Sequence, residues 1–393
     1  MSDTPPPIPA VVVGGSLNAL GVVRSLAHGR MPIYLLETSR RCAAGWSRHC
    51  KYVPISAPDG RALTTKLVEL ARKLACRPVL ILTSDQSVNC VSENRRVLEP
   101  LYRISLPAAE MVETLADKTL FQSLAEREGF NVPRSVCISD PAGLDRLEGL
   151  TPPLIVKPGD KTLVLKGLAE RAVVAATLSE ARRAAARMLS CAPRVIVQHF
   201  IDGPDTEIFF VLFSCDSSGK VLGLFPGRKL VCSPPTIGNT AVCVAAPAEA
   251  GELTSATLQF IKQVGYRGLG SLEFKRDRRS GRFVIIEPTV GRTDWQEEIA
   301  TLCGINLPLL TYHSEIGERV CSPEVAFPKV AWRSSVGIRS WLGPDVRTVD
   351  GYLRWSDPLP ALYYYGYERA LLRLWSKAAG KAPQLRRDRL AKE

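Results

Sequence analysis

Short apolar runs, separated by turns and helical stretches, dominate the first hundred residues. The runs at 10–13, 33–37 and 78–82 have the length and composition of buried strands. A turn over 14–21, rich in glycine, leads from the first run into an expected helix that ends near His28. A strand, a glycine turn, a helix and a second strand in this order predict a βαβ unit with a parallel sheet.

Polar residues follow two of these runs and are candidates for ligand contacts. Residues 83–85, Thr-Ser-Asp, come directly after the third run, and ligands of open α/β sheets bind beside the carboxyl ends of strands. The turn after the first run lacks the Gly-x-Gly-x-x-Gly spacing, so we do not expect NAD. It either presents backbone N–H groups with Ser16 or Asn18 to an anionic substrate, or it is a structural turn alone.

A new unit opens with a helix whose expected N-cap is Asp117 and which ends at Gly129. The apolar strand expected over 153–158 carries Lys157 just before a proline. A lysine fixed at this point would project into a site as a point charge suited to phosphate. An alanine-rich helix is expected over 178–189. The remaining strands are expected within 195–205, which runs from a strand into a turn, and over 208–213 and 221–225.

Two further apolar runs each carry one glutamate. Residues 270–274 contain Glu273, residues 283–290 contain Glu287, and the polar segment 276–281 joins the runs like a hairpin turn. A carboxylate in an apolar strand is unfavourable unless a cation meets it, and two on neighbouring antiparallel strands repel each other. Mg²⁺ with nucleotide phosphates would compensate both, because Mg²⁺ prefers one or two carboxylates plus phosphate oxygens and water. An edge hairpin with both glutamates facing water is the alternative.

Length and composition bound the class of protein. The 393 residues, with a mass of 43.0 kDa, predict two or three domains, and 46% hydrophobic with 23% charged residues is typical of globular proteins. No apolar run reaches the ~18 residues of a membrane span. Eleven cysteines without a Cys-x-x-Cys motif, and a start that lacks a signal-peptide pattern, predict reduced thiols in a cytoplasmic protein without a zinc site.

The net charge of +12 is partly local, because residues 366–393 carry eight basic and three acidic residues. Arg369, Arg373, Lys377 and Lys381 recur every four residues, so a helix here would carry one basic stripe and an apolar face. Such a helix either lies on an anionic membrane surface, at the inner face of the membrane, or packs its apolar face on the protein body. The other basic residues are not interleaved with aromatic ones, so we expect no nucleic-acid partner.

The order of these parts resembles the ATP-grasp superfamily. The features that carry the resemblance are the helix start Asp117-Lys118, the strand 155–158, the hinge 198–205 and the pair Glu273/Glu287. The likeness is greatest to predicted carboxylate–amine ligases similar to D-aspartate ligase, which also have a Ser-Asp like residues 84–85 and a segment like residues 304–308. The resemblance covers roughly residues 10–320.

The resemblance implies an architecture of α/β and α+β units. A Rossmann-like domain would cover 10–114, and the two lobes of an ATP-grasp fold would cover 115–192 and 193–325, the second lobe with the Mg–ATP site. Outside these units we expect a disordered lead-in over 1–9 and a C-terminal extension with the basic amphipathic helix over 326–393.

The resemblance also implies which side chains bind the nucleotide. Lys118 and Lys157 would contact the ATP phosphates, since a lysine offers charge without fixed geometry. Asp205 would accept hydrogen bonds from the ribose hydroxyls. Three hinge residues would line the adenine, namely Gln198, His199 and Ile201.

Glu273, Glu287 and Thr289 are the implied ligands of Mg²⁺, with Mn²⁺ as a further possibility. Two departures from the family pattern stand out. Thr289 occupies the position where the family usually has the asparagine of Glu-x-Asn. The loop over the phosphates, residues 159–167, carries lysines and apolar residues instead of the usual glycines and serines.

The implied reaction is the ATP-dependent ligation of a carboxylate to an amine. ATP would phosphorylate the carboxylate to an acyl phosphate, and the amine would displace phosphate to give an amide or peptide bond, with release of ADP. Arg292 would hold the acyl-phosphate oxygens with its planar fork, and Lys229 would be a third phosphate contact. The alternatives are a non-catalytic ATP-binding regulatory protein and an ATP-grasp carboxylase or kinase-like enzyme. The expected partners are a small-molecule acid and amine, and a homodimer is left open.

Overall fold

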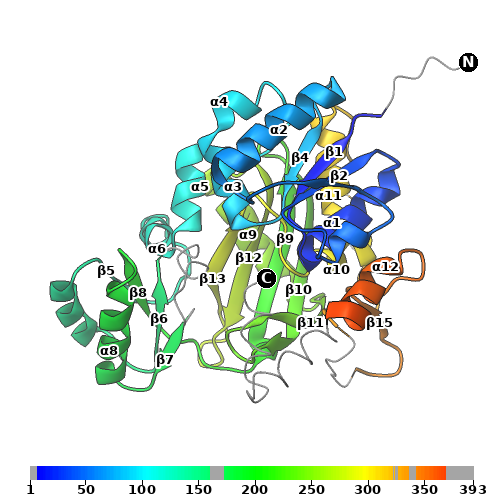
Figure 1. The fold of residues 1–393 in the computed structure, drawn as a ribbon. Coiled ribbons are helices and arrows are strands. Elements are labelled where there is room, and N and C mark those ends of the chain that lie inside the picture. Colours follow the sequence, from blue (N-terminus) through cyan, green and yellow to red (C-terminus); the bar gives the residue numbers. More distant parts are fainter. Residues whose placement is uncertain (1–6, 160–171, 322, 324–325, 336–341, 369–393) are drawn as a thin grey trace, which may run out of the picture.

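Three β-sheets organise the protein (Figure 1). The structure, a computed structural model, describes residues 7–159, 172–321, 323, 326–335 and 342–368. The basic stripe predicted for the tail, all but the first residue of the loop 159–167 and most of the expected lead-in lie outside the described residues. Among the described residues, no helix is both long enough and apolar enough to cross a bilayer. All eleven cysteines are free thiols.

The N-terminal sheet is parallel throughout, in the order β3-β2-β1-β4. Its strands are β1 (Ala10–Val13), β2 (Ile33–Glu37), β3 (Lys51–Pro54) and β4 (Val79–Leu82). Strands β1 and β4 are buried along their whole length, as expected for an apolar strand covered on both faces. The helices of this region are α1 (Leu17–Leu26), α2 (Gly60–Leu74), α3 (Asp85–Glu93), α4 (Arg95–Leu98) and α5 (Ala109–Ala116). The predicted parallel sheet is confirmed.

A second, antiparallel sheet has the order β5-β8-β6-β7. Its strands are β5 (Ser135–Ile138), β6 (Leu154–Pro158), β7 (Val173–Ala175) and β8 (Val195–His199). The helix α8 (Leu178–Leu189) forms over the residues predicted for it and buries an alanine-rich face in this sheet's own core. Strand β8 was expected in the second lobe, but it pairs with both β5 and β6.

The third sheet has seven strands in the order β13-β12-β9-β10-β11-β14-β15. The first five are β9 (Ile208–Cys215), β10 (Val221–Ser233), β11 (Asn239–Ala245), β12 (Gly268–Arg276) and β13 (Phe283–Val290). Neighbouring strands are antiparallel apart from the last pair, β14 (Val330–Arg333) and β15 (Arg347–Asp350), which is parallel. The helices of this region are α9 (Ala250–Val264), α10 (Glu298–Leu302) and α11 (Leu307–Glu315).

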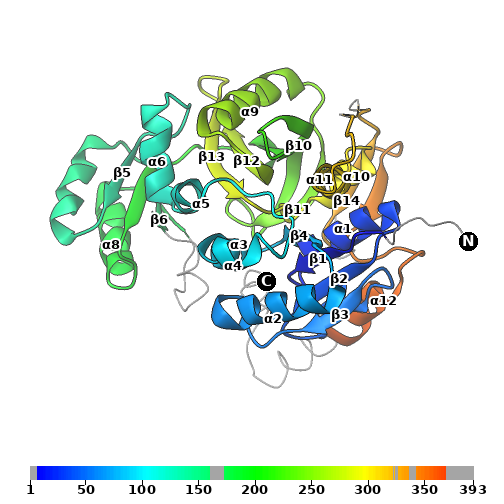
Figure 2. The same ribbon diagram turned by 90° about the horizontal axis from the view of Figure 1, so that it is seen from above.

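The last two strands lie in the segment that was expected to form a C-terminal extension. Strand β14 pairs with β11 and β15 pairs with β14, so this part of the chain continues the seven-stranded sheet. The chain then returns to the N-terminal sheet, where α12 (Leu359–Ala361) continues as a π-helix over Leu362–Glu368. In both views α12 lies beside the N-terminal sheet and far from β5 and α8 (Figures 1 and 2).

The parallel sheet and the seven-stranded sheet share their hydrophobic cores. Val11 and Val13 of β1 belong to one cluster with Phe209 and Phe213 of β9. Alternate residues of the same strands belong to a second cluster, which also contains Trp332 of β14. The sheet β5-β8-β6-β7 packs around a third cluster of its own. The chain thus has one large body and one smaller unit, and the helix α6 (Lys118–Arg127) connects them.

Candidate active site

A cleft of about 700 Å³ lies where the three sheets meet. Its lining includes the residues just after β1, β2 and β4, whose carboxyl ends lie at one edge of the parallel sheet. Strands β6 and β8 of the small sheet supply a second part of the lining, and β10, β12 and β13 supply a third. The carboxyl edge of a parallel sheet is the usual ligand site of open α/β folds.

Most of the residues predicted from the sequence line this cleft, although they come from six different elements and from the turns between them. The lining includes Lys118, Lys157, Gln198, His199, Ile201, Lys229, Glu273, Glu287, Thr289 and Arg292. The fold therefore brings together ten of the eleven predicted side chains, and Asp205 is the exception.

The two glutamates face each other directly in the register of the β12–β13 hairpin, where Glu273 is the partner of Glu287. Like charges placed opposite each other on paired strands destabilise a sheet unless they are compensated. Two lysines compensate them. Lys118 Nζ lies 3.2 Å from Glu287 Oε2, and Lys229 donates to Glu273 Oε2. The hairpin does lie at the edge of its sheet, because β13 is the outermost strand, but both glutamates line the cleft and each meets a lysine.

Lys229 is a buried cation, with 5% of the residue exposed. Burial by itself would lower the pKa of Lys229, but the Glu273 carboxylate beside it raises the pKa above the ordinary value. The ammonium therefore stays charged across the physiological range. Lys275 lies two residues beyond Glu273 on the same strand and donates to the carbonyl oxygen of Gly203 at 3.0 Å. Burial lowers the pKa of Lys275.

Lys275 is a cleft residue that the sequence analysis missed. The signal was present, because residues i and i+2 of a strand project from the same face. If Glu273 belongs to a site on this face of the strand, the same periodicity places Lys275 in that site.

Arg292 joins the two large sheets at the cleft. Its Nε and Nη2 donate to the two carboxylate oxygens of Asp85, at 2.7 and 3.1 Å, and its Nη1 lies 3.9 Å from Asp294 Oδ1. Burial acts to lower the pKa of Arg292, but the Asp85 carboxylate outweighs it and the pKa is raised. The planar fork is therefore held in one orientation by a bidentate contact.

The turn after β1 is shaped by backbone geometry. Gly14 has a φ of +120°, and a Cβ there would lie 2.1 Å from Thr83 Oγ1, so only glycine fits. Asn18 donates to the carbonyl oxygens of Thr83 and Thr293, at 3.0 and 2.9 Å. Asn18 thus ties the turn to the neighbouring strand ends. Ser16 lines the cleft, and its side chain makes no capping hydrogen bond to α1.

Apolar side chains line the part of the cleft next to the small sheet. They are Ile155, Phe200, Ile201, Ile208 and Ile286. Gln198 is 6% exposed, and its amide donates to Gln122 Oε1 at 2.9 Å. An apolar slot flanked by hinge backbone is suited to a flat aromatic ring.

Asp205 does not line the cleft. Its carboxylate oxygens accept hydrogen bonds from the backbone N–H groups of Cys232 and Thr236, each at 2.8 Å. The side chain therefore fixes the end of β10 and the turn that follows it. Asp205 is the last residue of the predicted hinge 198–205, and it begins a short helical turn over Asp205–Glu207.

The acidic residues of the cleft suit a metal only together with another ligand. Among the described residues, no group of three or more His, Cys, Asp or Glu side chains could hold a metal ion. Glu273, Glu287 and Thr289 offer two carboxylates and one hydroxyl. These oxygens fit Mg²⁺, which commonly takes one or two carboxylates and completes its shell with phosphate oxygens and water.

Comparison with known proteins identifies the fold. The biotin carboxylase domain of the 2-oxoglutarate carboxylase of Hydrogenobacter thermophilus superposes with a TM-score of 0.64 at 15% identity, over 79% of this chain and 70% of that one. The N5-carboxyaminoimidazole synthetase of Staphylococcus aureus, complexed with ADP, gives 0.65 at 13% identity, over 83% and 82%. The L-amino acid ligase of Bacillus licheniformis gives 0.61 at 16% identity, over 79% and 75%.

The chain has the ATP-grasp fold. The first of these structures contains MgADP and bicarbonate. No protein-family model and no curated protein sequence matches the chain. The similarity is therefore structural, and at 13–16% identity it concerns the fold alone.

Proposed function

We propose that the chain is an ATP-dependent ligase that joins a carboxylate to an amine and releases ADP and phosphate. The observation that carries this proposal is the pair Glu273/Glu287, which meets Lys118 and Lys229 inside a cleft bordered by Arg292. Proteins of the same fold support it, because their structures contain ADP or MgADP and one of them is an L-amino acid ligase. The finer resemblance to D-aspartate ligase belongs to the same proposal.

In this proposal the small sheet and the large body hold the nucleotide from opposite sides. Lys118 and Lys157, at the start of α6 and the end of β6, neutralise phosphate charge. The apolar slot with Gln198, His199 and Ile201 takes the adenine ring. Glu273 and Glu287, assisted by Thr289, would hold Mg²⁺, which offsets phosphate charge when bound.

The reaction has two balanced steps. An oxygen of the substrate carboxylate bonds to the γ-phosphorus of ATP, the bond to the bridging oxygen breaks, and ADP leaves. The amine nitrogen then bonds to the carbonyl carbon, the carbon–oxygen bond to phosphate breaks, and the amine loses a proton. Arg292 contributes by positioning: its guanidinium, oriented by Asp85, offers donors to the anionic oxygens that develop near the parallel sheet.

Carboxylation is the second candidate. Two of the three superposed enzymes carry carboxylase or carboxyaminoimidazole in their names, and one contains bicarbonate. Bicarbonate is itself an acid that ATP can activate, so the same cationic cleft suits it. The requirement for bicarbonate separates the two reactions.

A screen of ADP release over small carboxylic acids, amines and bicarbonate tests the proposal. We expect release to rise only when an acid and an amine are present together, and the amide product to be detected by mass spectrometry. Release that needs bicarbonate would assign carboxylation instead. Nucleotide binding without release in any combination would contradict both reactions and favour a regulatory protein.

A further inference from the structure

Exposed apolar side chains gather on the C-terminal segment. The described part of the chain exposes ten large hydrophobic residues, and five of them lie between 353 and 367. Trp355 is 90% exposed and Leu362 is 64% exposed. A cluster of exposed apolar side chains on a protein surface commonly marks an interaction site.

Some of these side chains adjoin a group of stacked aromatic rings, and together we call them the aromatic face. Trp46 of the N-terminal unit stacks on Tyr363 with ring centroids 5.8 Å apart, and Tyr363 lies 5.7 Å from Tyr367. Leu359 and Leu362 precede Tyr363 by four positions and one position in the same helical stretch, and both are exposed. We define the aromatic face as the ring group Trp46, Tyr363 and Tyr367 together with the exposed side chains that precede Tyr363 in the sequence, namely Trp355, Leu359 and Leu362.

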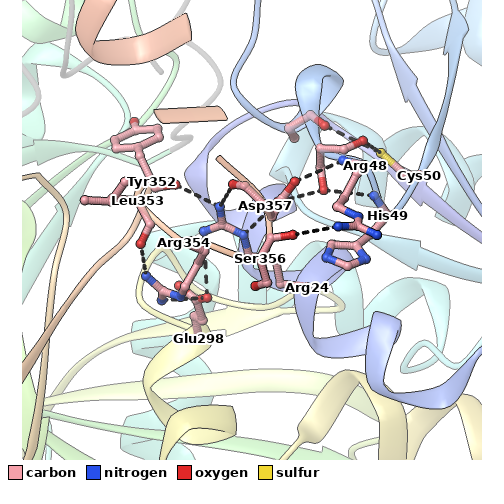
Figure 3. Close-up of polar contacts among 12 residues, drawn as sticks. Arg24, Arg48, His49, Cys50, Glu298, Tyr352, Leu353, Arg354, Ser356 and Asp357 are labelled. Carbon is pink, nitrogen blue, oxygen red and sulfur yellow. Dashed lines mark hydrogen bonds and ion pairs between the residues drawn. The ribbon is translucent and has the colours of Figure 1, made fainter. Parts of the chain in front are cut away.

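A buried ion pair anchors the backbone that carries this face (Figure 3). Arg24 of α1 donates from Nε to Asp357 Oδ2 at 3.0 Å, and its other nitrogens donate to the carbonyl oxygens of Gly351 and Tyr352, both at 2.8 Å. Asp357 also accepts from the backbone N–H of Arg48 at 3.0 Å. The exposed apolar side chains thus sit on a fixed platform.

The chain beside the aromatic face is basic. Residues 38–51 include Arg40, Arg41, Arg48 and Lys51 but no aspartate or glutamate, and these four basic residues are all exposed. The guanidinium of Arg40 lies 5.2 Å from the centre of the Trp46 ring. Later in the sequence, residues 369–393, which lie outside the described part, carry eight basic and two acidic residues. Exposed cations therefore surround Trp46 in the sequence, and one of them contacts its ring.

We propose that the aromatic face docks on an anionic lipid surface. Tryptophan and tyrosine rings favour the level of the lipid headgroups, leucine side chains enter the acyl boundary, and arginine and lysine pair with lipid phosphates. The exposed leucines of the face favour lipid over a nucleic acid, which would offer no apolar phase to bury them. The face lies at the end of the molecule away from the small sheet, so docking leaves that sheet free (Figures 1 and 2).

Co-sedimentation of the full chain with vesicles tests the proposal. One set contains phosphatidylcholine alone, and the other contains phosphatidylcholine mixed with phosphatidylglycerol. We expect binding to the mixed vesicles and a decrease in binding with salt. The triple variant Trp355→Ala/Leu359→Ser/Leu362→Ser should lose about tenfold or more in partition coefficient, because it removes most of the apolar area that enters the lipid. The control Leu258→Ser, at an exposed leucine of α9, should bind like the wild type.

Three results would overturn the proposal. The first is a wild-type chain that does not sediment with the mixed vesicles at low salt. The second is a triple variant that binds as well as the wild type, including the case in which deletion of residues 369–393 alone abolishes binding. The third is a triple variant that converts a dimer into a monomer in sedimentation equilibrium, with vesicle binding unaffected, which would make the face a subunit contact. Because the substituted side chains are exposed, circular dichroism should be the same for all these variants.

Discussion

In the cleft, Lys118 and Lys229 each contact one glutamate of the facing pair, and their burial differs. The side chain of Lys229 is 7% exposed and that of Lys118 is 16% exposed. Loss of Glu273 would leave the more deeply buried ammonium without its partner, which is costly in a poorly solvated site. Lys118, which contacts Glu287, is more accessible to water than Lys229. Glu287 is therefore the better residue for a test of activity that must leave the fold intact.

Glu297 is a buried acid between α1 and α10. It is 1% exposed, and Ser25 and Thr301 donate hydrogen bonds to it. Burial, followed by the neighbouring charge of Glu298, raises the pKa of Glu297 from 4.5 to about 8. The stabilisation that comes from this raised pKa is fully present below pH 4.5 and is lost as the pH rises through about 8.

The substitution Glu297→Gln should remove this pH dependence. The free energy of unfolding of the variant, measured relative to that of the wild type, should increase by roughly 2–4 kcal/mol from acidic to alkaline pH. Urea unfolding at pH 5 and pH 9 measures the difference. Glu110→Gln, at an exposed position of α5, serves as the control and should follow the wild type at both pH values. A constant difference between Glu297→Gln and the wild type would mean that Glu297 is ionised in the folded protein.

At the scale of elements, the segment 351–357 holds the C-terminal part of the chain on α1. Arg24 and Asp357 are 7% and 1% exposed, so their contact is almost free of solvent screening. Removal of one partner from a buried pair leaves an uncompensated charge. The contact therefore links the first helix, α1, to the chain segment that directly precedes α12.

Asp357→Asn should lower the free energy of unfolding by about 3–5 kcal/mol. The matched control is Asp345→Asn, because Asp345 also pairs with a cation, Lys329 at 3.7 Å, but both side chains are more than 70% exposed. An exposed pair contributes about 0–1 kcal/mol. If urea unfolding shows equal losses of unfolding free energy for the two variants, the Arg24–Asp357 contact stabilises the fold no more than an exposed ion pair does.

Some helices and strands of this fold can be predicted from the sequence, because their local pattern of apolar and polar residues matches the way they pack. The helix 178–189 and the N-cap at Asp117 were predicted correctly, because an amphipathic face and a capping side chain are local signals. The facing of Glu273 and Glu287 also follows from a short hairpin with alternating strands. The fold itself corresponds to the resemblance that the order of motifs suggested.

Other features depend on partners distant in the sequence. The pairing of β14 with β11 joins residues almost ninety positions apart, and no local signal indicates which strand a four-residue run will join. The position of β8 in the small sheet has the same origin. Asp205 has the residue type expected for a ribose contact, but its carboxylate accepts hydrogen bonds from backbone N–H groups at the end of β10 and in the turn after it.

At the scale of the whole molecule, the cores explain where the cleft lies. The parallel sheet and the seven-stranded sheet are fused through two shared hydrophobic clusters, whereas the small sheet has a cluster of its own. The cleft is bordered by the fused body on one side and by the small sheet on the other. Charged side chains can therefore face each other there without displacing either core.

The most direct test of this account is the rate of ADP release by Glu287→Ala with Mg²⁺, ATP and the acid and amine found in the screen. The account predicts a loss of at least about a hundredfold in kcat/KM, because the variant removes one of the two carboxylates at the phosphates. Glu318→Ala, at an exposed glutamate on the chain after α11, should retain wild-type activity. Thermal unfolding checks that both variants are folded. A folded Glu287→Ala variant that releases ADP at the wild-type rate would contradict the assignment of the cleft.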